Sequence, residues 1–367
     1  IYDHFTPAVV DYLISLPGFL TAYTPYQPEV SQGTLQSLFE FQSLLARLTK
    51  MELASAAVYD GGSAVAEAAL LALRVKRKRK RIIIAESLNP FYKQVLKTYL
   101  EPQDVQLVEV SHKNGRIDKA ELKKRANKDT SAFIFQSPNF YGVIENPEGL
   151  RELIGDGLLV TVANPISLAL LKPPGDYDVD VVVGEGQSFG WHKYFGGPAL
   201  GFFASRKKFV RKLPGRIVGE TTDTEGQRGF VLVLQTREQH IRRQEATSNV
   251  CTNETLIAIA CAIYLSLAGE NGLRKVANLS MQKAHYLARK LTSIDGVELV
   301  YSTPFFNEFL LELPVSSSEL KDKLYNRGFL AGYPIDEKRL LLAVTEKRSK
   351  EEMDNFVKAF GEVCRKS

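Results

Sequence analysis

Residues 81–100 read RIIIAESLNPFYKQVLKTYL, a short apolar run followed by a stretch of helical character. The run RIIIAE does not alternate polar and apolar residues, which is typical of a strand covered on both faces. The stretch PFYKQVLKTYL predicts a helix. A buried strand followed by a helix is the repeating unit of a parallel sheet with helices on both sides.

The same alternation continues in both directions from this stretch, over residues 32 to about 205. We predict further strands in ASAAVY (54–59), VQLVEV (105–110), SAFIFQ (131–136), GLLVTVAN (157–164) and DVDVVVGEG (178–186). Further helices are predicted at 32–50, 63–76 and 119–126. GPALGFFAS (197–205) adds one more strand, for which an antiparallel direction is an option. These elements indicate an α/β fold with a mainly parallel sheet.

The pattern changes after residue 215. Residues 216–252 are rich in Gly, Thr and Arg and contain one strand-like run, GFVLVLQT (229–236). A long helix follows and is expected to end at Gly269, because glycine commonly ends helices. A second long helix is expected over residues 273–294, and the tail then alternates strands and helices. We therefore predict three parts: an N-terminal extended arm (1–31), a large α/β domain (32–274) and a small C-terminal α+β domain (275–367).

Composition argues against several classes of protein. The 367 residues are 44% hydrophobic and carry a net charge of +5, but seven of the basic residues cluster in RVKRKRKR (74–81). We interpret this cluster as a solvated corner between a helix and a strand, and less readily as a nucleic-acid site. Cys251, Cys261 and Cys364 lack metal-ligand spacing, and no apolar run approaches ~18 residues. We expect a cytoplasmic protein with no metal, nucleic-acid or membrane partner.

In open parallel sheets, ligands bind at the carboxyl ends of the strands. Gly61, Gly62 and Ser63 follow one strand and open a helix, so their backbone amides could bind a phosphate, although a simple turn uses the same residues. Asn164 follows another strand, where an acid could pair with the pyridinium nitrogen of pyridoxal phosphate. Its neutral amide argues against a complete cofactor site.

Lys193 lies in GEGQSFGWHKYFGGPALGFF (184–203), just before the Gly196–Gly197 pair. This neighbourhood is typical of a lysine that forms a Schiff base with pyridoxal phosphate. Such a lysine needs burial or nearby cations to lower its pKa. A loop lysine is more often simply solvated, and the residues alone leave both interpretations open.

The stretch YTPYQPE (23–29) combines aromatic and polar side chains in an unusually short segment. It is predicted to be extended, because proline biases the residue before it away from the helical conformation. We interpret it as part of a site or an interface. An ordinary arm packed on a neighbouring element is the alternative.

A second polar stretch, TREQHIRRQEATSNVCTNET (236–255), places arginines around His240. Arginine binds carboxylates and phosphates in a bidentate manner, so these side chains could bind an anionic ligand. A network of salt bridges at an interface fits the residues equally well. The polar residues that follow are expected to include a cap for the next helix, from among Ser248, Asn249, Thr252 and Asn253.

Three stretches resemble one known family: TAYTPYQPEVSQG (21–33), LPGRIVGETTDTEGQRGFVLVLQTREQHIRRQEATSNVCTNE (213–254) and FFNEF (305–309). The family is glycine dehydrogenase (decarboxylating) subunit 1, the alpha chain of the split P-protein of the glycine cleavage system. The resemblance covers the whole chain. It implies the fold-type I architecture of pyridoxal-phosphate-dependent enzymes, with a transferase-like large domain.

The resemblance also implies an activity and partners. The alpha chain pairs with a homologous beta chain, subunit 2, in a heterotetramer, and the beta chain binds the pyridoxal 5'-phosphate through its Schiff-base lysine. The enzyme takes glycine, releases CO2 and passes the aminomethyl group to the lipoyl arm of a carrier protein. No Schiff-base lysine is then expected in this chain, and Lys193 is interpreted as local variation.

Site residues follow from the same resemblance. Those expected to line the shared site or the interface are Tyr23, Thr24, Tyr26, Gln27, Glu29, His240, Arg242, Arg243, Ser248 and Asn249. Gly61, Gly62 and Ser63 are expected to contribute to cofactor binding at most in a minor way. Asn164 departs from the aspartate that the resemblance leads us to expect more often in the alpha chain.

Two other functions stay open from the sequence. A self-sufficient pyridoxal-phosphate-dependent lyase or aminotransferase would use Lys193. A non-enzymatic homologue would only stabilise or regulate a partner.

Overall fold

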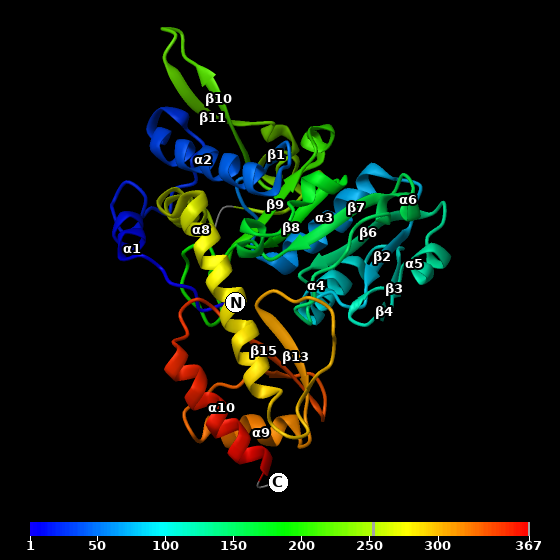
Figure 1. Cartoon of the computed structure of the whole chain (residues 1–367). Coiled ribbons are helices and arrows are strands. Elements are labelled where there is room, and N and C mark those ends of the chain that lie inside the picture. Colours follow the sequence, from blue (N-terminus) through cyan, green and yellow to red (C-terminus); the bar gives the residue numbers. More distant parts are fainter. Residues whose placement is uncertain (252–253, 366–367) are drawn as a thin grey trace.

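The structure, a computed structural model, describes residues 1–251 and 254–365. Its centre is a seven-stranded sheet with the strand order β1-β9-β8-β7-β6-β2-β3 (Figure 1). The strands of this sheet are β1 (Leu53–Ala54), β2 (Arg81–Ala85), β3 (Gln106–Val110), β6 (Thr130–Ser137), β7 (Leu158–Ala163), β8 (Val181–Glu185) and β9 (Gly201–Ser205). From β8 to β3 all neighbouring strands are parallel, whereas β9 is antiparallel to both β8 and β1. The mainly parallel sheet is therefore confirmed.

Helices cover both faces of this sheet and create two apolar cores. One core lies under α2 (Gln32–Thr49), α5 (Lys119–Arg125), α6 (Leu150–Ile154) and the first half of α8 (Thr255–Leu291). The other lies under α3 (Gly61–Val75) and α4 (Pro90–Leu100). Because β6 and β7 are buried on both faces, their sequences show continuous apolar runs rather than alternation.

The C-terminal part of the chain forms a second, smaller structural unit with its own apolar core. A four-stranded antiparallel sheet has the order β12-β13-β15-β14 and packs against α9 (Ser317–Tyr325), α10 (Lys350–Arg365) and the second half of α8. Its strands are β12 (Glu298–Leu299), β13 (Glu308–Glu312), β14 (Tyr333–Pro334) and β15 (Arg339–Ala343). Because α8 runs through both parts (Figure 1), a domain boundary at residue 274 stays a prediction.

One predicted helix end is confirmed, and one predicted strand is shorter than expected. α8 consists of two helical segments that meet at Gly269, whose φ of 55° and ψ of −171° are not helical, so the first segment ends at Gly269 as predicted. The strand expected at 54–59 is shortened to β1, because Ser55 donates its N–H to Phe203 but Ala56 donates to the carbonyl of Arg216. Because the hydrogen-bond partner changes from Phe203 to Arg216 here, the pairing of β1 with β9 ends after two residues.

Two other segments contain more structure than the sequence predicted. The N-terminal arm is not wholly extended, because α1 (Ala8–Ile14) is a helix whose Val10 and Ile14 are buried in the core beside α8. After residue 215 the chain forms a hairpin of β10 (Ile217–Thr222) and β11 (Arg228–Val233), not one strand. This hairpin projects beyond α2 (Figure 1). A shorter hairpin pairs β4 (His112–Lys113) with β5 (Arg116–Ile117).

Within residues 1–251 and 254–365, α8 alone is long and apolar enough to cross a membrane by length and composition. Half of its apolar stretch is buried inside the fold, where it packs beside α2 and α1. The kink at Gly269 also interrupts this stretch. These features are those of a core helix of a folded domain.

Candidate functional site

At the carboxyl edge of the large sheet, the sequence left open whether Gly61, Gly62 and Ser63 bind an anion or form a simple turn. Here α3 begins, and the carboxylate of Asp60 caps it by accepting the N–H of Ser63 at 2.7 Å. Gly61 and Ser63 are buried. The Gly61 N–H, however, donates to the side chain of Glu185 at 3.0 Å. The chain's own carboxylate therefore takes an amide that could have bound an external anion.

Glu185 ends β8 and receives three backbone hydrogen bonds. Besides Gly61, the N–H groups of Gln187 and Leu200 donate to its carboxylate at 3.1 and 3.2 Å. Burial raises the pKa of Glu185 to about 7, although all three N–H groups favour the ionised form. The sequence did not single out Glu185, because its three donors lie far from one another along the chain.

Two tyrosines fill the space around this carboxylate. Tyr92, from α4, places its hydroxyl so close to Gly61 that a Cβ added there would lie 2.5 Å from the oxygen. Tyr2 donates its hydroxyl to Glu308 at 2.9 Å and its backbone N–H to the side chain of Gln187 at 2.9 Å. Burial raises the pKa of both phenols well above the ordinary value. The first residues of the chain thus cross this edge and pack into it.

Asn164 and Lys193 do not complete a cofactor site. The side-chain oxygen of Asn164 accepts the N–H groups of Ile166 and Ser167 at 3.1 and 3.3 Å, so it stabilises the turn after β7. The Lys193 ammonium lies 3.4 Å from the Asp3 carboxylate, and its side chain is 45% exposed. Pyridoxal phosphate needs a phosphate anchor, a partner for its ring nitrogen and an amine. The residues at this edge do not fit it.

The predicted arm residues form a separate cluster around Tyr26. Arg216 donates to the Tyr26 hydroxyl at 2.7 Å, and its guanidinium lies 5.1 Å from the centre of the tyrosine ring. The ring of His240 lies 4.9 Å from the ring of Tyr26. Residues from two predicted stretches, 23–29 and 236–255, are therefore brought together, and Arg216 joins them.

Arg216 and Glu238 are the buried centre of this cluster, and sequence reasoning missed both. The Arg216 side chain is 4% exposed and lies 3.1 Å from the Glu238 carboxylate, which His240 approaches at 3.6 Å. Burial raises the pKa of Glu238, while Arg216 opposes that shift. The hairpin β10–β11 separates the two residues in sequence, so only the fold reveals the pair. The one sequence signal for this pair was Arg216 itself, which follows Gly215 directly before β10.

The remaining arm residues are largely open to solvent. Tyr23 donates its hydroxyl to the Gln27 side chain at 3.0 Å, and both are exposed. Glu29 is exposed and Thr24 is half-buried. The segment has no regular structure up to Gln27, as predicted for YTPYQPE, and a short 3-10 turn follows at Pro28–Val30. It therefore presents aromatic and polar side chains outward.

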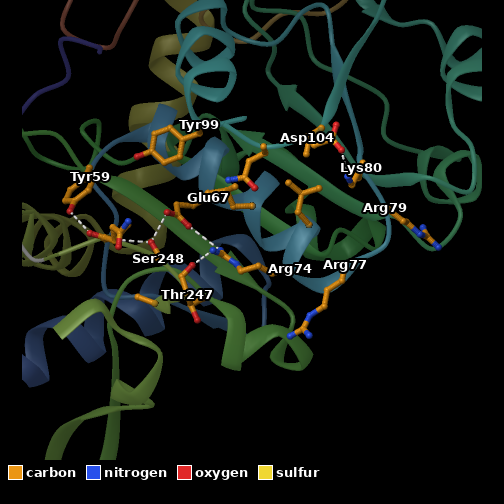
Figure 2. Close-up of a pocket in the computed structure, with 17 residues that line it drawn as sticks. Tyr59, Glu67, Arg74, Arg77, Arg79, Lys80, Tyr99, Asp104, Thr247 and Ser248 are labelled. Atoms are coloured by element: carbon orange, nitrogen blue, oxygen red, sulfur yellow. Dashed lines mark hydrogen bonds and ion pairs between the residues drawn. The ribbon is translucent and has the colours of Figure 1, made fainter. Parts of the chain in front are cut away.

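Ser248 and Asn249 lie on another face, beside α3 (Figure 2). The Ser248 hydroxyl donates to Glu67 at 2.7 Å, and Glu67 also pairs with Arg74 at 3.3 Å. The backbone carbonyl of Asn249 accepts the Tyr59 hydroxyl at 3.1 Å. These residues line an open cleft of about 810 Å³. Neither caps α8, whose N-cap position is Glu254; Thr252 and Asn253 lie outside the described residues.

The arginines of the second stretch have different surroundings. Arg237 is buried and donates to the carbonyl of Leu213, so its role is structural. Arg242 is more exposed, lies 4.0 Å from Glu245 and donates to the carbonyl of Thr236 at 3.2 Å. Arg243 is exposed and has a positive φ of 52°. Arg237 and Arg242 line one open pocket of about 210 Å³ together with Arg211 and Glu245, whereas Arg243 is not among its lining residues.

The basic cluster at 74–81 forms a corner with acidic neighbours. Lys76 and Arg79 lie 3.0 and 2.7 Å from the Asp156 carboxylate, and Lys80 pairs with Asp104. Arg77 is exposed at the rim of the cleft (Figure 2). This arrangement agrees with the predicted solvated corner.

The sheet order, the antiparallel β9 and the helix that starts at the carboxyl edge define an α/β fold of the pyridoxal-phosphate-dependent transferase type. The same fold occurs in a solved structure of "C-DES", a mutant with glycine covalently linked to its cofactor (TM-score 0.70, 13% identity, 97% of this chain and 94% of that one). At this identity the likeness concerns the fold alone.

The chain belongs to the family described as glycine cleavage system P-protein, whose sequence model matches residues 1–360. It is 47% identical to a probable glycine dehydrogenase (decarboxylating) subunit 1 from Chloroherpeton thalassium, over 99% of this chain and 83% of the relative. The crystal structure of an inhibitor-bound glycine decarboxylase superimposes with a TM-score of 0.93 at 43% identity, over 99% of this chain and 83% of that one. The predicted family, fold class and glycine decarboxylase function are confirmed.

Proposed function

We propose that this chain is the glycine decarboxylase subunit that carries no Schiff-base lysine and that it shapes one side of a site shared with subunit 2. Subunit 2 would bind the pyridoxal phosphate. The observation that carries the proposal is the Glu185 carboxylate at the start of α3, where a cofactor phosphate would otherwise bind. The name "subunit 1" of the relatives supports a second, different subunit.

When bound by the partner, pyridoxal phosphate supplies an electron sink for the loss of CO2 from glycine. The residues of this chain would orient the substrate and exclude water from it. Tyr26 is suited to this task because Arg216 already donates to its oxygen, which leaves the phenolic hydrogen free to donate outward. The exposed side chains of Tyr23, Gln27 and Glu29 extend the same surface.

His240, which lies beside Tyr26, and Arg242 and Arg243, which follow it, are proposed interface or site residues next to the arm. Ser248 and Asn249 are proposed interface or site residues on the separate face beside α3. The cleft beside Ser248 contains more basic than acidic side chains, which favours an acidic or phosphate-bearing neighbour. The proposal includes a heterotetramer in the cytoplasm. It also includes glycine as substrate and a lipoylated carrier protein as the acceptor of the aminomethyl group.

Reconstitution tests the proposal. The chain, subunit 2 and their mixture are assayed for exchange of labelled bicarbonate into glycine, with the lipoylated carrier protein present. We expect exchange only in the mixture, together with co-elution of the two chains on gel filtration. Exchange by this chain alone would instead support a self-sufficient enzyme, and full exchange by subunit 2 alone would support a non-enzymatic role for this chain.

A further inference from the structure

We propose that Glu185 is a built-in anion that replaces a ligand phosphate at the N-terminus of α3, and that it keeps this chain's own copy of the cofactor pocket closed. The inference rests on the same Glu185 contact as the proposed function and deepens it, because it states which ligand that carboxylate replaces. It states that the position filled by the Glu185 carboxylate would otherwise bind a phosphate or a phosphate monoester.

The hydrogen bonds support this assignment. α3 spans 15 residues, and the N-terminus of such a helix attracts negative charge through its free amides and its dipole. Here the Gly61 N–H donates to Glu185 and the Ser63 N–H donates to Asp60. Glu185 also receives the N–H groups of Gln187 and Leu200, so amides from three separate segments converge on one carboxylate. Converging backbone amides of this kind are the usual cradle of a bound phosphate.

The packing supports it as well. A Cβ built on Gly61 would lie 2.5 Å from the Tyr92 hydroxyl and 3.1 Å from Cβ of Glu185, so side chains already touch the backbone that a phosphate would approach. On the outer side, Tyr2 is held between Gln187 and Glu308 by hydrogen bonds of 2.9 Å each. A phosphate could take the place of the Glu185 carboxylate, whereas an attached pyridine ring would also have to displace the tyrosines.

The single tryptophan of the chain offers a local probe. Trp191 donates its backbone N–H to the carbonyl of Gln187 at 3.1 Å, and the Gln187 side chain donates back to the carbonyl of Trp191 at 2.6 Å. Gln187 is itself bonded to Glu185. Ligand binding at this edge should change Trp191 fluorescence, whereas phosphate bound at the basic corner 74–81 should not.

The experiment titrates inorganic phosphate into the full chain at about pH 8, above the pKa of Glu185, and follows Trp191 fluorescence and calorimetric heat. Glu185→Ala should bind phosphate at least about tenfold more tightly than the wild type, because it frees three amides at a helix N-terminus. Glu185→Gln keeps the size of the side chain but removes its charge, and should show a smaller gain. The matched control is Glu86→Ala, since Glu86 follows β2 at the same edge but is exposed; it should behave as the wild type.

Two results would overturn the inference: folded Glu185 variants that bind phosphate no more tightly than the wild type, or a wild type that binds phosphate with a Trp191 response. If Glu185→Ala does not fold, Glu185→Gln decides between the outcomes. The titration uses this chain alone and measures no turnover. Its failure would therefore leave the bicarbonate-exchange result untouched, and a failed reconstitution would leave the phosphate result standing.

Discussion

The carboxyl edge of the large sheet and the arm surface use the same kinds of side chain in opposite ways. At the edge, Tyr2 and Tyr92 are half-buried beside the carboxylates of Glu308 and Glu185, and desolvation raises their pKa values well above normal. On the arm surface, Tyr23 and Tyr26 are 45% and 37% exposed. Tyrosine and glutamate thus occur in both regions. The degree of burial and the hydrogen-bond partners, rather than the residue type, distinguish the edge that we propose to be closed from the surface that we propose to face the shared site.

The two regions also anchor their carboxylates differently. Glu185 is bound by backbone amides, which the sheet and α3 fix in place. Glu238 is bound by the side chain of Arg216, which also holds Tyr26 of the arm. A single substitution of Arg216 should therefore release the arm surface while leaving the hydrogen bonds of Glu185 intact.

The largest effect is expected from Arg216→Met. It leaves the buried Glu238 carboxylate without its cation and frees Tyr26, so the free energy of unfolding should fall by about 3 kcal/mol. Bicarbonate exchange by the reconstituted complex should fall with it. Urea unfolding and the exchange assay measure the two effects. Arg228→Met is the control, because its pair with Glu220 at 2.7 Å is exposed and should contribute less than about 1 kcal/mol. Equal losses in both variants would contradict the account.

Tyr26→Phe should come next. It removes the acceptor of the Arg216 hydrogen bond and the outward-facing hydroxyl, so turnover should drop about tenfold while the complex still co-elutes on gel filtration. Glu29→Gln, on the exposed end of the arm, should also lower turnover without dissolving the complex. Tyr12→Phe alters an exposed tyrosine on α1 and should have no effect. Wild-type turnover in both arm variants would exclude the arm from the site.

A smaller effect concerns pH and the closed edge. The pKa of Glu185 is about 7 in the folded chain against an ordinary 4.5, so the folded state binds this proton more tightly than the unfolded state. The stability that this proton contributes is complete below about pH 4.5 and is lost as the pH rises through about 7. Glu185→Gln cannot titrate, so its unfolding midpoint should fall less over that range. Identical pH profiles would show that Glu185 has no raised pKa.

The smallest effect is expected from Lys193→Ala. Its ammonium makes a half-exposed ion pair with Asp3 at 3.4 Å, which is worth about 0–1 kcal/mol. Exchange activity and the unfolding midpoint should therefore stay near wild-type values, with Lys172→Ala, at another solvent-facing lysine, as the control. A large loss of exchange activity in Lys193→Ala alone would indicate that the carboxyl edge of this chain takes part in catalysis, contrary to our proposal that it is closed.

The sequence predicted those parts of the molecule whose signals are local. Continuous apolar runs identified β2, β6, β7 and β8. The role of the stretch 23–29 in a site or an interface stays a prediction. The helix stop at Gly269 was also a local signal, because the positive φ of 55° that ends the first segment of α8 is a conformation that glycine adopts without strain. The strand expected at 54–59 is shorter than predicted, because a change of hydrogen-bond partner between distant segments ends β1.

The missing parts of the site depend on contacts between distant segments. Glu185 acquires its role only when Gly61, Gln187 and Leu200 converge on it. Arg216 meets Glu238 only because the β10–β11 hairpin folds back. Neither carboxylate lies in a motif, so the spacing of residues in the sequence could not point to either contact.

Borohydride reduction of the reconstituted complex, followed by peptide mass mapping, tests the central claim most directly. The reduction converts any Schiff base between pyridoxal phosphate and a lysine into a stable secondary amine, which adds a pyridoxyl mass to the peptide that contains the lysine. We predict that the mass appears on a lysine of subunit 2 and on no peptide of this chain. A reduced pyridoxyl group on Lys193, or on any other lysine of this chain, would contradict the account.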